Sequence, residues 1–103
     1  MHEFIEEKKG QIARLCRQYG VRSLEIIGSG ARGNDFDVAS SDADFLVEFN
    51  PIRITSPLEQ FFGLRDALSE VLERHVDLIE AKAILNPYVQ ASVNNARELV
   101  YAA

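Results

Sequence analysis

The stretch SLEIIGSGARGNDFDVASSDADFLVEF, residues 23–49, decides how the rest of the chain is interpreted. It begins with an apolar run rich in branched side chains (23–27), which is typical of a buried strand. A tight Gly28-Ser29 turn and a small, polar, acid-rich segment follow, and a second apolar run occupies 45–49. The stretch therefore predicts two strands joined by a long polar loop.

The remainder of the chain predicts further helices and strands around these two. Apolar residues recur at helical spacing in two segments, the second of which begins with a capping residue followed by proline, and Asn86-Pro87 repeats this start signal for a third helix. The predicted helices are residues 3 to about 19, 57 to about 74 (with Ser56 as its N-cap) and 87 to about 95; a third strand is predicted at 75–79, and residues 98–102 are either a fourth strand or a helical tail. The predicted fold class is α+β (α/β), with a small mixed sheet of three to four strands flanked by helices.

Composition limits both the size and the partners of the protein. With 103 residues, of which 47% are hydrophobic, we expect a single domain (1–103) around one modest core. The 16 acidic and 11 basic residues give a net charge of −5, which makes nucleic acid an unlikely partner. No apolar run has the length of a membrane span, so no membrane association is expected. Cys16 is the single cysteine; we expect it to pack in the core, and its isolation fits a reducing cytoplasm.

Residues 28–33, Gly-Ser-Gly-Ala-Arg-Gly, match the dinucleotide-binding pattern G-x-G-x-x-G, and Glu48 lies 20 residues after Gly28. A dinucleotide fold needs a long amphipathic helix between its first two strands. Residues 34–44 have no helical periodicity, and the chain is too short for two nucleotide-binding halves. The sequence therefore argues against a dinucleotide-binding domain.

Asp42 and Asp44 offer a different chemistry at the start of the second strand. Side chains at i and i+2 of a strand point to the same face, so these two carboxylates can converge. Magnesium in nucleotide sites is held by a few carboxylates together with phosphates and water. Asp77, an acid within the apolar run 76–79, is the candidate for a third carboxylate, because a lone buried charge there would be costly.

The turn after the first strand is the candidate phosphate site. If it opens a short helix, its free backbone N–H groups and the Ser29 hydroxyl can hold a triphosphate. Arg32 is placed to add a guanidinium. Each part has a simpler explanation: an isolated Asp-x-Asp pair is commonly a solvated strand start, and Asp77 alone could face water on an edge strand. The arrangement of all the parts favours a metal and nucleotide site.

Three segments together resemble a known family: Gly28-Ser29 with Ala31-Arg32-Gly33, then Ser41 to Phe49, then Val76-Asp77-Leu78. This set is similar to the minimal nucleotidyltransferases of the polymerase β-like superfamily. It most resembles the MntA-type antitoxins of HEPN/MNT toxin–antitoxin pairs. The resemblance extends over nearly the whole chain and implies the polymerase β-like palm fold.

The resemblance also implies roles for individual residues. Gly28 and Ser29 would hold the nucleotide phosphates, Asp42 and Asp44 would bind two Mg²⁺ ions, and Asp77 would be the third catalytic and metal-binding carboxylate. Proteins of this type move AMP from ATP onto a tyrosine of a HEPN toxin. Two other functions stay open: an inactive antitoxin that neutralises its partner by binding alone, and transfer to a small-molecule hydroxyl.

The two histidines are not assigned to the site. No nearby histidine or cysteine gives His75 metal-ligand spacing, so we interpret it as structural or exposed. We expect His2 to be disordered.

Overall fold

The structure, a computed structural model, describes residues 2–28, 42–51, 55–83 and 97–103. The helices are α1 (Glu3–Glu7), α2 (Lys9–Gln18) and α4 (Pro57–Leu72), with a 3₁₀ turn η1 (Ala81–Ala83). The strands are β1 (Val21–Ile27), β2 (Ala43–Phe49), β3 (Val76–Glu80) and β4 (Arg97–Ala102). Within these ranges, no helix is long and apolar enough to cross a membrane.

The four strands form one mixed sheet in the order β3-β2-β1-β4. β1 is antiparallel to both of its neighbours, β2 and β4, whereas β2 and β3 are parallel. The predicted mixed sheet of three to four strands is therefore confirmed. Of the two alternatives for the C-terminal segment, the strand is correct and the helical tail is wrong. The helix predicted at 87–95 lies outside the described residues.

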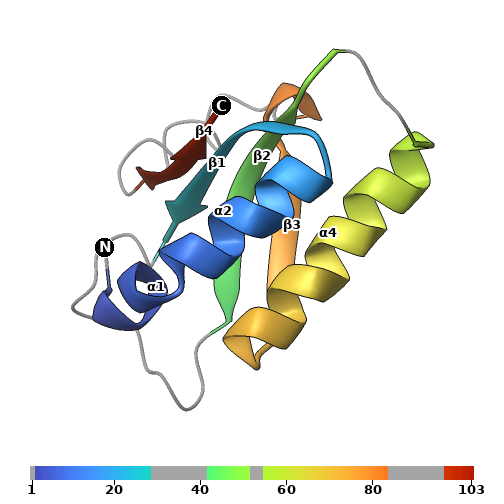
Figure 1. The fold of residues 1–103 in the computed structure, drawn as a ribbon. Helices are drawn as coiled ribbons and strands as arrows, with labels where there is room; N and C mark the ends of the chain where they lie inside the picture. Colours follow the sequence, from blue (N-terminus) through green and yellow to red (C-terminus); the bar gives the residue numbers. More distant parts are fainter. Residues whose placement is uncertain (1, 29–41, 52–54, 84–96) are drawn as a thin grey trace.

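The helices α2 and α4 cover one face of the sheet, as Figure 1 shows. The core between these layers is built from alternate strand residues, such as Leu24, Phe45 and Val47, packed against helix residues such as Ile12 and Leu64. Intervening strand residues such as Asp44 point to the opposite face. The alternation thus separates the apolar core from the face that carries the acids.

Cys16 belongs to this core, as predicted, and is fully buried. Burial raises the pKa of its thiol to about 12, so it stays a neutral, unreactive packing residue at physiological pH.

The helix predicted at 3–19 is wrong in one respect, because the chain forms two helices with a break at Lys8. The Lys8 amide donates to the Ile5 carbonyl, three residues back, at 3.0 Å, which tightens the turn. Gly10, just beyond the break, lowers the local helix propensity. His2 is not disordered: its Nδ1 accepts the Phe4 amide at 3.0 Å and caps α1.

The predicted start of the second long helix is confirmed. Ser56 Oγ accepts the Glu59 amide at 3.2 Å, and Pro57 occupies the first helical position. The helix ends at Leu72 rather than near Arg74, because Glu73 takes the left-handed conformation (φ 54°) without being a glycine. α4 then leads into β3, which carries Asp77.

Gly63 is where α4 passes the Tyr19 ring, and it gives a test of the packing. A Cβ on Gly63 would lie 2.7 Å from Tyr19 Cε1, closer than atoms can approach. We expect Gly63→Ala to lower the free energy of unfolding by about 1–2 kcal/mol, measured by urea denaturation. In a Tyr19→Ala background the same change should cost nothing.

Gly10→Ala is the matched control, because no atom lies within 4 Å of a Cβ at Gly10. It should raise stability by up to about 1 kcal/mol, since alanine is the better helix former. Equal effects at the two glycines would contradict the packing explanation.

Candidate active site

Three neighbouring strands place the candidate residues in one row across the sheet. In the ladder, Ile27 of β1 lies opposite Asp44 of β2, and Asp44 lies opposite Asp77 of β3. Gly28 follows β1 directly. The end of β1 and the beginnings of β2 and β3 therefore meet at one end of the sheet, and the predicted convergence of Asp44 with Asp77 is found there.

Asp42 joins this group from just before β2. One ligand atom from each of Asp42, His75 and Asp77 lies within 4.8 Å of the others. Asp42 also raises the pKa of Asp44 by charge repulsion, as Asp77 does, so Asp44 interacts electrostatically with both of the other carboxylates. The structure brings the three acids together; their roles as metal ligands stay a prediction.

Asp44 is the most perturbed carboxyl of this group. Its pKa is raised from 3.8 to about 6, first by partial burial, then by a hydrogen bond with the Asp77 carboxyl and by the charges of Asp77 and Asp42. The charge of His75 opposes this shift. Gathered like charges of this kind are stabilised by binding a cation.

The expectation of a costly buried charge at Asp77 is wrong, and the alternative that Asp77 faces water on an edge strand is correct. Asp77 is on an edge strand, and its side chain is 55% exposed, so it is not a costly buried charge. Asp44, on the central strand β2, is the acid that is partly buried. Burial therefore disfavours the charged form of Asp44, a member of the Asp-x-Asp pair.

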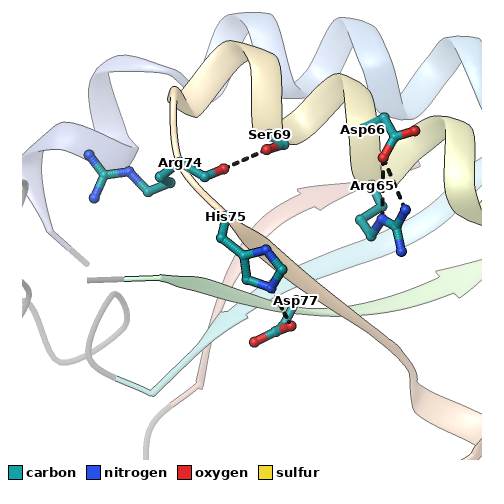
Figure 2. A network of polar contacts seen from close by, with 6 residues as sticks. All are labelled: Arg65, Asp66, Ser69, Arg74, His75 and Asp77. Carbon is teal, nitrogen blue, oxygen red and sulfur yellow. Dashed lines mark hydrogen bonds and ion pairs between the residues drawn. The ribbon is translucent and has the colours of Figure 1, made fainter. Parts of the chain in front are cut away.

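His75 is the residue that the sequence analysis missed. It is exposed, as expected, but its Nε2 lies 3.0 Å from Asp77 Oδ1, as Figure 2 shows. The missed signal was the i,i+2 relation of His75 and Asp77, which is the same relation that joins Asp42 and Asp44.

Gly28 lies beside the carboxylates with its backbone in the left-handed region (φ +68°). A Cβ at this position would lie 3.5 Å from Asp44 Oδ2, so the Gly28 backbone runs close to that carboxylate. The left-handed conformation favours glycine, which explains the residue type. Ser29 and Arg32, the other predicted nucleotide contacts, lie outside the described residues.

The donor set suits a hard divalent cation. Asp42, Asp44 and Asp77 supply carboxylate oxygens, the ligands that Mg²⁺ prefers. His75 is the one described residue whose charge lowers the Asp44 pKa. A cation at this end of the sheet would relieve the repulsion that raises that pKa.

A hollow of about 610 Å³ lies at the opposite end of the sheet. It is bordered by the last residues of β2, by η1 and by Arg22. It is therefore separate from the carboxylates at the beginning of β2.

Asp44 should make the metal-free protein lose stability as pH rises. Its folded pKa, about 6, is above its ordinary value of 3.8, so the folded state holds the proton more tightly. Stability falls between these values and the penalty is complete above pH 6. Allowing for solvent screening, Asp44→Asn should raise the free energy of unfolding by about 1 kcal/mol at pH 7.5 and by much less near pH 4. Urea denaturation in EDTA at both pH values measures the difference; a loss of stability at pH 7.5 would contradict it.

A mixed four-stranded sheet with helices on one face, carrying three carboxylates at the start of two parallel strands beside a glycine turn, defines a nucleotidyltransferase fold. Residues 8–100 match the family model described as "Nucleotidyltransferase domain", so the chain belongs to this family. The resemblance noted from the sequence is confirmed.

Relatives and solved structures agree with this assignment. A protein of Methanocaldococcus jannaschii named "putative protein adenylyltransferase" is 40% identical over 87 residues, covering 84% of this chain and 82% of its own. A solved structure described as a "putative minimal nucleotidyltransferase" is 28% identical with a TM-score of 0.71, covering 95% of both chains. A chain in the solved complex of tri-AMPylated Shewanella oneidensis HEPN toxin with MNT antitoxin shares the fold. Its TM-score is 0.65 at 15% identity, and the match covers 96% of this chain and 73% of that chain.

Proposed function

We propose that this protein is a Mg²⁺-dependent adenylyltransferase that moves AMP from ATP onto a tyrosine of a HEPN-type toxin and thereby acts as its antitoxin. The observation that carries the proposal is the proximity of Asp42, Asp44 and Asp77 at one end of the sheet. Two comparisons support it: a relative named for protein adenylylation, and a shared fold with an antitoxin whose toxin partner is AMPylated.

In this proposal the chain's own residues bind and orient the reactants. Asp42 and Asp44, with Asp77, would hold two Mg²⁺ ions, which when bound neutralise charge on the α-phosphoryl group and the leaving pyrophosphate. The backbone after Gly28 and the Ser29 hydroxyl would hold the phosphates, and Arg32 would add a positive charge. Gly28 fits this role because its backbone already lies beside Asp44.

The chemical step is an in-line displacement. The acceptor oxygen attacks the α-phosphorus of ATP, the bond from that phosphorus to the β-phosphate oxygen breaks, and pyrophosphate leaves. The Asp77 carboxylate helps to take the proton of the acceptor hydroxyl. An exposed Asp77 on an edge strand is open to an acceptor that approaches from solvent.

The exposure of Asp77 favours a protein acceptor. The Asp77 side chain is 55% exposed on an edge strand, so an acceptor meets an open surface here rather than an enclosed pocket. A partner protein would complete the pocket with its own surface. We place the reaction in the cytoplasm, where ATP is available and an isolated thiol such as Cys16 stays reduced.

The experiment is to incubate the protein with ATP labelled in the α-phosphate, Mg²⁺ and the product of the adjacent gene. Label on a tyrosine of the partner, lost in the Asp42→Asn, Asp44→Asn double variant, is the expected result. Neutralisation of the partner without label would favour the alternative of an antitoxin that acts by binding. Labelling of sugars or other small hydroxyl compounds instead would favour a small-molecule substrate.

A further inference from the structure

A backbone hydrogen bond places His75 at the end of the sheet that carries the three carboxylates. Its carbonyl accepts the Ala43 amide at 3.1 Å, which joins the beginning of β3 to the beginning of β2. Because His75 and Asp77 are two residues apart on an extended segment, their side chains share a face. The imidazole lies next to Asp77, and Figure 2 shows its ring directed at that carboxylate.

The distances fit a shared coordination shell. In an octahedral shell with bonds of about 2.1 Å, adjacent donors lie about 3.0 Å apart and opposite donors about 4.2 Å apart. His75 Nε2 and Asp77 Oδ1 are 3.0 Å apart, which is the adjacent separation. Donor atoms of Asp42, His75 and Asp77 all lie within 4.8 Å of one another, so small side-chain movements would place all three on one ion.

An imidazole nitrogen changes which ions such a site prefers. Mg²⁺ takes oxygen ligands almost entirely, whereas first-row transition metals such as Mn²⁺, Co²⁺ and Zn²⁺ accept imidazole nitrogen together with carboxylate oxygen. The side chains of His75 and Asp77 are 65% and 55% exposed, so an ion can reach them from solvent.

We propose that His75 is a further metal ligand which, with Asp42 and Asp77, raises the affinity of this site for divalent first-row transition metal ions, while Mg²⁺ binds through the carboxylates alone. The inference rests on the proposed function only in that Asp42 and Asp77 hold a divalent cation. It adds an ion class that the three carboxylates alone do not select. The simpler role for His75, orientation of Asp77 through the hydrogen bond, predicts no change in the preference among ions.

The test is titration of the full chain at pH 7.5, without nucleotide, with Co²⁺ and with Mg²⁺. Calorimetry gives the dissociation constants, and the Co²⁺ absorption spectrum reports nitrogen ligation. In His75→Ala the Co²⁺ dissociation constant should rise at least about tenfold, with a change below about threefold for Mg²⁺. His75→Gln can keep a hydrogen bond to Asp77 but has no imidazole, so it should behave like His75→Ala. His2→Ala, which removes the other imidazole, should leave both constants unchanged.

Three results would overturn the inference. Equal weakening of both ions, restored by His75→Gln, would show that His75 only orients Asp77. No change in either constant would make His75 a surface residue. Binding of neither ion to the unaltered protein would remove both this inference and the proposed Mg²⁺ site, whereas Mg²⁺-dependent labelling with an unchanged ion preference would remove this inference alone.

Discussion

Asp77→Asn is expected to lower the rate of adenylyl transfer by at least about 100-fold. The substitution keeps the shape of the side chain but removes the negative charge, so Asp77 can neither accept the acceptor's proton nor offer a charged ligand to the metal. Because Asp77 is exposed on an edge strand, the fold should not change. The measurement is a single-turnover assay with labelled ATP and saturating partner, with circular dichroism as the check on folding.

Asp66→Asn is the control, because Asp66 is an exposed acid on α4 whose carboxylate contacts Arg65. It removes the same charge in a different part of the molecule and should leave the rate within about twofold. If Asp77→Asn kept more than a tenth of the activity, the proposed role of Asp77 would have to be abandoned. An equal loss in both variants would point to an effect of net charge alone.

The proximity of Asp42 to Asp44 could be predicted from the sequence because the two residues are two positions apart where a strand begins, although β2 itself begins at Ala43. The contact between Asp44 and Asp77 depends on β3 lying next to β2 in parallel register. Local periodicity indicates that a strand exists but not its neighbour. The presence of a third acid was therefore predictable, whereas its exposure on the edge strand β3 was not.

The position of His75 beside Asp42 also could not be predicted from the sequence. Comparison with other histidines and cysteines in the sequence gave no metal-ligand spacing. The Ala43 amide that bonds the His75 carbonyl belongs to a segment more than 30 residues earlier in the chain. The proximity of His75 to Asp42 is created by strand pairing, so it follows from the sheet and not from the spacing of residues in the sequence.

The C-terminal end of α4 differs from the prediction for a local reason. Glu73 ends α4 in the left-handed conformation that usually requires glycine or asparagine. Its amide donates to the Ser69 carbonyl, and Ser69 Oγ donates to the Arg74 carbonyl at 2.6 Å, which Figure 2 shows. These contacts replace the residue type that would have marked the end of the helix.

The affinity for Mg²⁺ should fall about tenfold between pH 7.5 and pH 5.0. A carboxyl must lose its proton to bind the ion, and the Asp44 pKa of about 6 lies inside this range. With an ordinary value of 3.8 the affinity would be nearly constant. Calorimetric titration at several pH values measures the effect, with light scattering as a check because the pI is about 4.9.

Two variants assign this dependence to its group. Asp44→Asn should bind Mg²⁺ more weakly at pH 7.5 and should lose the pH dependence, because the titrating carboxyl is gone. His75→Gln should keep the dependence; this control is needed because imidazole side chains also titrate in this range. If the slope disappeared in His75→Gln and persisted in Asp44→Asn, the proton that competes with Mg²⁺ would be on the imidazole. The raised pKa of Asp44 would then not be the cause of the pH dependence of Mg²⁺ affinity.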